Sequence, residues 1–228
     1  MKPVGILGGM GPEATILLMQ KVLDAVVAGD DADHVPLIVH QNPQVPSRIR
    51  ALIEGGGDDP APVLAAMARD LERAGAVALA MPCNTAHHYA GAVRGASSLP
   101  FLDMLSLTGR ALKARGARRV GMLASPATRK VGAFDGIFAA HGLEPVWTAD
   151  EDAMLALIRA VKAGERPEKL RPGLRDLAEA MGGADHWLVA CTELSLMTDV
   201  LDGGPGWTDS LDCLVGAVVR MARDGVVD

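Results

Sequence analysis

Short apolar runs recur along the chain and alternate with longer segments of helical periodicity. An aliphatic run bounded by glycine, proline or charged residues is typical of a strand that is covered on both faces. Each run with this pattern predicts a buried strand. The runs are residues 4–7, 35–40, 76–81, 119–123 and 186–190.

The segments between these runs predict helices. Pro12 and Glu13 open a helical segment that reaches Val27, with proline in the first turn and a carboxylate at the positive end of the helix dipole. Residues 60–74 and 150–163 have the same helical character. Strands that alternate with helices of this length form parallel sheets with helices on both faces, so the predicted fold class is α/β.

The order of elements repeats in the two halves of the chain. The strand at the end of the first half leads into Cys83, and the corresponding strand of the second half leads into Cys191. We therefore predict two α/β domains, at residues 1–102 and 103–209, with a last helix at about 210–228 packed against the first domain. Ligands bind beyond the carboxyl ends of strands in open parallel sheets, so both cysteines are expected where substrates bind.

Composition and charge favour a globular protein that acts on small molecules. The chain is 49% hydrophobic and 22% charged, which predicts a packed aliphatic core. Its net charge of -6, with no cluster of Lys and Arg, argues against nucleic acid or an anionic membrane as a partner. Glycine and proline interrupt the apolar N-terminal stretch too soon for a signal peptide or a membrane span, so we expect a cytoplasmic protein.

The chain shows no pattern for a metal or a cofactor. Its 3 cysteines predict free thiols rather than a disulfide framework, and no spacing of His, Cys and carboxylates fits a metal site. The turn Gly8-Gly9-Met10-Gly11-Pro12 does not match the dinucleotide fingerprint, and its glycines are expected to let the backbone approach a small carboxylate. Any chemistry is therefore expected from ordinary side chains.

Cys83 and Cys191 have the context of reactive thiols. Each follows an apolar strand and precedes a short helical segment, a position that favours the thiolate, and Thr85 is a candidate N-cap for the first of these segments. A lone cysteine is more often a buried apolar side chain. Two cysteines on facing sides of a cleft, however, have the arrangement that a racemase needs: one thiol removes a proton from one face of a carbon and the other returns a proton on the opposite face.

Two histidines and the third cysteine have simpler interpretations. His87 and His88 follow the first cysteine, and either relays its proton or is a satisfied polar group of the helix. Cys213 lies among Leu211, Leu214 and other apolar positions of a helical pattern, which predicts core packing.

Three sequence motifs extend over most of the chain: GILGGMGPEAT near the start, NPQVPSR at 42–48, and the pair PCNTAH and CTEL around the two cysteines. Together they resemble the aspartate/glutamate racemase family, in particular its aspartate racemase branch. Glutamate racemases of this superfamily begin with an Asp-Ser-Gly loop and carry a histidine two places after the second cysteine. This chain has Gly8-Gly9-Met10 and Glu193 at those places.

The resemblance implies a homodimeric racemase, independent of pyridoxal phosphate, whose active site lies in the cleft between two pseudo-symmetric α/β domains. Cys83 and Cys191 would exchange a proton at the α-carbon of an acidic amino acid, with aspartate as the expected substrate. Arg48 and Lys162 of this chain are cations that suit the two carboxylates of such a substrate, although each is also typical of a solvated surface position. The residues that match the family's substrate contacts are Met10, Arg48, Asn84, Thr85, Lys162 and Thr192.

The chain departs from the family pattern in two places. Ser195 replaces the proline of the commoner motif CTELP, a proline that would stiffen the loop after Cys191. Members often carry Asp-[Ser/Thr]-Thr-x-x-His near the C-terminus, whereas here Asp209-Ser210 continues without that histidine. Both changes leave the two cysteines in place, but they weaken what the resemblance implies about the identity of the substrate.

Three other functions stay open at this point. The first is a racemase of broad amino-acid specificity. The second is an enzyme similar to maleate isomerases or arylmalonate decarboxylases, in which a cysteine attacks an alkene or protonates an enediolate. The third is a non-catalytic module that binds dicarboxylates. A shared fold is weak evidence for a shared chemistry, so the sequence does not decide among them.

Overall fold

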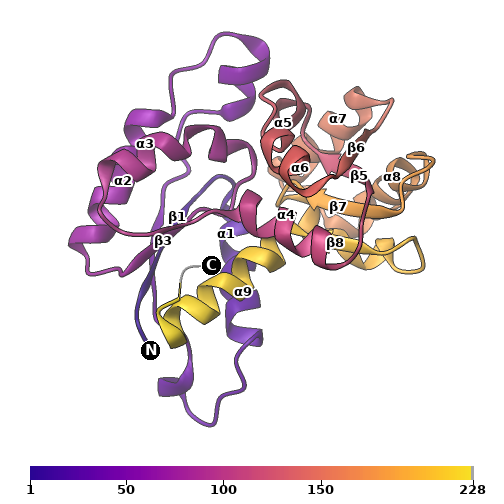
Figure 1. Cartoon of the computed structure of the whole chain (residues 1–228). Helices are drawn as coiled ribbons and strands as arrows, with labels where there is room; N and C mark the ends of the chain where they lie inside the picture. The colour runs from indigo at the N-terminus through magenta and orange to yellow at the C-terminus, as the bar shows by residue number, and fades with distance from the viewer. Residues whose placement is uncertain (227–228) are drawn as a thin grey trace.

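A computed structural model describes residues 1–226, which form two four-stranded parallel sheets with helices on their faces (Figure 1). The first sheet has the strand order β2-β1-β3-β4 and the second has the order β6-β5-β7-β8. The predicted α/β class and the repeat of one architecture in both halves are confirmed. The strands are β1 (Val4–Gly8), β2 (Leu37–Gln41), β3 (Ala78–Ala80), β4 (Phe101–Leu102), β5 (Arg119–Ala124), β6 (Glu144–Trp147), β7 (His186–Ala190) and β8 (Trp207–Asp209).

The helices begin where the local sequence supplies a start signal. Pro12 occupies the first turn of α1, with Glu13 beside it, as the sequence predicts. Among the described residues, no helix is both long and apolar enough to cross a bilayer. The α-helices are α1 (Pro12–Asp24), α2 (Ala61–Arg73), α3 (Ala90–Ala96), α4 (Met104–Ala114), α5 (Pro126–Lys130), α6 (Asp135–His141), α7 (Glu151–Lys162), α8 (Pro167–Glu179) and α9 (Ser210–Asp224). Four short helical segments are η1 (Asp31–Asp33), η2 (Arg50–Glu54), η3 (Thr85–Tyr89) and η4 (Leu194–Leu201).

The repeated strand order places the two cysteines at equivalent points. In each sheet the first strand pairs in parallel with both the second and the third, so β1 lies between β2 and β3, and β5 lies between β6 and β7. The second strand is added on one side of the first strand and the third strand on the other side. In open α/β sheets, ligand crevices form where the strand order reverses in this way. Cys83 follows β3 and Cys191 follows β7, so each lies at the carboxyl end of such a strand.

Helices α4 and α9 join the two halves. In Figure 1 the yellow helix α9, which follows β8 of the second sheet, lies beside α1 and α4. Its residues Leu214 and Val218 belong to one buried cluster with Val4 and Ile6 of β1. Helix α9 (Ser210–Asp224) therefore packs against the first sheet, and residues 227–228 of the predicted last helix lie outside the described part. The domain boundary at 102/103 stays a prediction.

Asp209 fixes the start of α9. Its Oδ1 accepts a hydrogen bond from the backbone N–H of Leu211 at 2.8 Å and another from Ser195 Oγ at 2.9 Å. Its Oδ2 is buried and has no hydrogen-bond partner among the described residues, with Lys21 Nζ 3.9 Å away. The hydroxyl of Ser195, at the position where the family commonly has proline, thus links η4 to the N-cap of α9.

The Asp209→Asn variant should gain stability relative to the natural protein as the pH rises. Burial, together with Asp212, raises the pKa of Asp209 from 3.8 to about 7. A carboxyl group with a raised pKa stabilises the fold below its unfolded pKa, and this contribution is lost as the pH rises through its folded pKa. Unfolding by urea at about pH 4 and about pH 8 should show a relative gain for the variant, with a ceiling of roughly 4 kcal/mol. An unchanged difference between the two pH values would contradict a titration of Asp209 in this range.

Candidate active site

A cleft of about 290 Å³ lies between the two sheets, and both halves of the chain supply its walls. The six predicted site residues that line it are Met10, Arg48, Cys83, Thr85, Lys162 and Cys191. Both cysteines are nearly buried, with 8% of Cys83 and 6% of Cys191 exposed. The structure thus brings the two thiols to one cavity from equivalent strand ends.

Lys162 at the end of α7 lies within electrostatic reach of both sulfur atoms. Burial alone would lower the pKa of this lysine, but the Glu193 carboxylate and the sulfurs of Cys191 and Cys83 outweigh burial and raise it. The lysine is therefore charged at neutral pH. An ammonium group in this place stabilises a thiolate on either side of the cleft.

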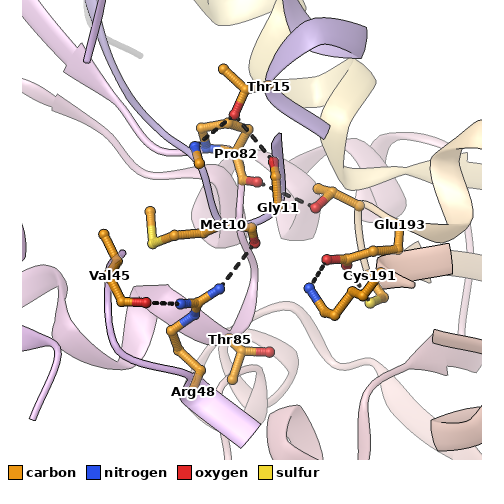
Figure 2. A network of polar contacts seen from close by, with 12 residues as sticks. Met10, Gly11, Thr15, Val45, Arg48, Pro82, Thr85, Cys191 and Glu193 are labelled. Carbon is orange, nitrogen blue, oxygen red and sulfur yellow. Dashed lines mark hydrogen bonds and ion pairs between the residues drawn. The ribbon is translucent and has the colours of Figure 1, made fainter. Parts of the chain in front are cut away.

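Glu193 lies beside Cys191 in Figure 2 and connects this cysteine to Lys162. Its Oε1 forms a short ion pair with Lys162 Nζ, and its Oε2 accepts a hydrogen bond from Cys191 Sγ at 3.1 Å. Only 4% of Glu193 is exposed. Burial, followed by the Glu193 carboxylate, raises the pKa of Cys191 well above its usual range despite the opposite effect of Lys162. Cys191 is therefore a protonated thiol when the cleft is empty.

Arg48 holds the cleft wall together from inside. Its Nη1 donates to the carbonyl oxygens of Val45 at 3.1 Å and Pro46 at 2.8 Å, and its Nη2 donates to the carbonyl of Met10 at 3.3 Å (Figure 2). The guanidinium group of Arg48 is therefore not free to bind a carboxylate through both terminal nitrogens, because each of them already donates to backbone carbonyls. Its Nε is buried without a hydrogen-bond partner among the described residues.

The side chains of Asn84, Thr85 and Thr192 connect the two halves. Asn84 Nδ2 donates to Ser210 Oγ at 2.9 Å, Thr192 Oγ1 donates to the carbonyl of Pro82 at 3.2 Å, and the hydroxyls of Thr85 and Thr128 lie 3.2 Å apart. Asn84 and Thr192 do not line the cleft, unlike the other predicted substrate contacts. Thr85 is also not an N-cap: it is the first residue of η3, and the cap position falls on Asn84, which makes no side-chain cap bond.

The glycines after β1 differ in their surroundings. Gly9 has φ +94°, and a Cβ there would lie 2.4 Å from the backbone of Asn42, so local packing requires this glycine. A Cβ on Gly11 would face Glu193 and Lys162 at 3.6 and 3.9 Å. Both glycines line the cleft, and the close approach of this backbone to a ligand stays a prediction.

His87 is a structural residue. Its Nε2 accepts the backbone N–H of Met104 at 3.2 Å, so Nδ1 carries the proton and donates to the carbonyl of Cys83 at 2.8 Å. Burial lowers the pKa of His87, which keeps the ring neutral. His88 is exposed and lies edge-on to Tyr89. Neither histidine is bonded to a thiol, and the interpretation as satisfied polar groups is the one the geometry favours.

The segment after β2 carries Arg48 and reaches the second half (Figure 1). At its far end, the carbonyl of Ile53 accepts a bond from Lys130 Nζ at 3.3 Å, and Glu54 forms an ion pair with Arg159 at 2.6 Å. We refer to residues 43–57 as the β2–α2 segment. This segment lines one side of the cleft, and it packs against α2 of the first half and α5 of the second half.

Several residues that line the cleft were not predicted as site residues, and three of them are Glu193, Glu13 and Ser125. Glu193 entered the sequence argument only as a marker of family type, although a carboxylate two places after a reactive cysteine was a usable signal. Glu13 and Ser125 also line the cleft. Ser125 follows β5 as Gly9 follows β1, so the internal repeat pointed to its position.

Comparison with known proteins gives the family of the chain. The broad specificity amino-acid racemase RacX of Bacillus subtilis is 26% identical over 225 residues, which are 95% of this chain and 96% of that protein. The structure of Picrophilus torridus aspartate racemase has a TM-score of 0.89 at 29% identity, over 97% of this chain and 94% of the other. An aspartate racemase homologue from Pyrococcus horikoshii shares the fold, with a TM-score of 0.73 at 22% identity over 98% and 100% of the two chains.

The family model for Asp/Glu/Hydantoin racemases matches residues 7–218, and this range contains both strand-end cysteines and every wall of the cleft. The chain belongs to the Asp/Glu/Hydantoin racemase family.

Proposed function

We propose that this chain racemises an amino acid by proton exchange at the α-carbon between Cys83 and Cys191, without pyridoxal phosphate. One observation carries the proposal: two thiols from equivalent strand ends line a single cleft. One sulfur takes the α-proton while the other gives a proton to the opposite face of the carbon. Lys162 supports the negative charge that develops, because its ammonium is close to both sulfurs.

The proposed substrate is an acidic amino acid, with aspartate first. The Picrophilus torridus relative is an aspartate racemase. Arg48 has a buried Nε without a partner among the described residues, which a substrate carboxylate would satisfy. A substrate carboxylate near Lys162 would share that cation with Glu193.

A broad-specificity racemase is the second candidate, and the charge of the cleft favours it. The carboxylates of Glu13 and Glu193 line the cleft with Arg48 and Lys162, so two negative groups offset two positive ones. A cleft that is neutral in sum also accepts an amino acid with an uncharged side chain. The Bacillus subtilis relative carries the name of such an enzyme.

Incubation of the purified protein with L-aspartate in deuterated water tests the reaction. A racemase forms D-aspartate that carries deuterium at the α-carbon, with no added pyridoxal phosphate. A panel of neutral and acidic amino acids under the same conditions distinguishes the two candidate specificities. Absence of α-deuterium from every amino acid, with maleate or an arylmalonate consumed instead, would replace the racemase by the isomerase or decarboxylase alternative. Binding without any turnover would leave a dicarboxylate-binding module. A homodimer and a cytoplasmic location stay predictions.

A further inference from the structure

The two thiols of the cleft have unequal neighbours. Cys191 Sγ donates to Glu193 Oε2 at 3.1 Å, and Glu193 lies two residues further along the chain. The equivalent position after Cys83 is Thr85, whose hydroxyl contacts Thr128 of the other half instead. The fold repeats, but the carboxylate beside the sulfur is found on one side of the repeat.

Glu193 is held in one orientation by two polar contacts and by burial. Its Oε1 pairs with Lys162, its Oε2 accepts from the Cys191 thiol, and only 4% of the residue is exposed. With the Lys162 ammonium on Oε1, the other carboxylate oxygen of Glu193 faces the sulfur and accepts a proton donor. The Cys191 S–H group is that donor.

We propose that Glu193 is a positioning residue that keeps the proton on Cys191 in the free enzyme, so that Cys191 is the first acid and Cys83 the first base. This inference rests on the two-thiol function proposed above. In the first half of the cycle, the α-C–H bond breaks and its proton forms an S–H bond with Cys83. The S–H bond of Cys191 breaks as a new C–H bond forms on the opposite face, which leaves Cys191 as a thiolate beside Lys162. The starting form returns when Cys83 gives its proton to water and Cys191 takes one.

The titration of a single thiol tests this assignment apart from turnover. The double variant Cys83→Ser/Cys213→Ser leaves Cys191 as the one cysteine of the chain. Its thiolate is followed by ultraviolet absorbance against pH. Glu193→Gln in this background removes the negative neighbour and frees Lys162, so the thiolate should form at a pH lower by about one unit, a tenfold change.

Two further variants give opposite and neutral results. Lys162→Met removes the cation and should move the Cys191 titration to higher pH. Glu165→Gln is the matched control, because Glu165 is an exposed carboxylate paired with Lys169 at 3.4 Å on the same half, and it should leave the titration unchanged. Should Glu193→Gln fail to fold, Glu193→Asp withdraws the carboxylate from the sulfur and should give a smaller shift in the same direction.

In the enzyme with all its cysteines, Glu193→Gln should also move the basic limb of the kcat/KM profile to lower pH. A Cys191 titration that is the same with and without Glu193 would overturn the inference. Full turnover in a cysteine variant would instead overturn the two-thiol function, while the titration would still report the contact of Glu193 with Cys191. The two failures are therefore distinguishable.

Discussion

Cys83→Ala and Cys191→Ala should each lower kcat/KM for racemisation by about 10²- to 10⁴-fold, the range for a positioned acid or base. Each thiol serves one face of the α-carbon, so the loss of either stops inversion in both directions. The remaining thiol can still remove the α-proton of one enantiomer and return a solvent proton on the same face. We therefore expect each variant to exchange the α-hydrogen of one enantiomer in deuterated water without inverting it, and the variant that retains Cys191 to do so more slowly, because the pKa of this thiol is raised and its thiolate is scarce.

Chiral chromatography with proton NMR of the α-position measures both events. Cys83→Ala and Cys191→Ala should exchange opposite enantiomers. Cys213→Ala is the matched control, because Cys213 lies outside the cleft and packs beside the α9 cluster. Full inversion by either cleft variant would refute the assignment of both thiols.

Lys162→Met should impair both stability and substrate binding. The substitution leaves the buried Glu193 carboxylate without its cation, and an unpaired buried charge is strongly destabilising. Because 33% of the Lys162 side chain is exposed, we expect a loss of about 1–3 kcal/mol in the free energy of unfolding rather than the full buried value. The KM for an acidic substrate should rise by about 10- to 100-fold, the size of a charge-assisted hydrogen bond.

A double variant separates these two effects. In Lys162→Met/Glu193→Gln the buried charge is gone, so urea unfolding should show most of the stability restored, while the KM stays high. A stable Lys162→Met variant with an unchanged KM would mean that Lys162 is the solvated helix-end cation that its sequence context also allows.

The sequence predicted the four inner strands and the outer strand β2, but it did not predict the outer strands β4, β6 and β8. β1, β5 and β7 are covered on both faces, so continuous apolar runs marked them. β4 has 2 residues, and β6 contains Pro145 and an exposed Glu144, so neither has enough pattern to predict a strand. Their pairing with β3 and β5 comes from tertiary contacts that no short window of sequence contains.

The site shows the same division between local and long-range information. Strand-end placement located Cys83 and Cys191, because this depends only on where an apolar run stops. The partners of Arg48 were not predictable, since its carbonyl acceptors belong to a turn whose shape is set by packing. The contact of Glu193 with Lys162 joins residues 31 positions apart, and it required the fold.

The β2–α2 segment makes an exposed ionic contact with the second half of the chain, and such contacts depend on ionic strength. It contributes Arg48 to the wall, and its outer end is tied to the opposite half by the exposed pair between Glu54 and Arg159. Any separation of the two halves would break this pair. Salt screens exposed charges more than buried ones, so added salt should weaken this outer contact while the Lys162–Glu193 pair inside the cleft is largely spared. We therefore expect ionic strength to affect the contact between the halves more than the charges beside the thiols.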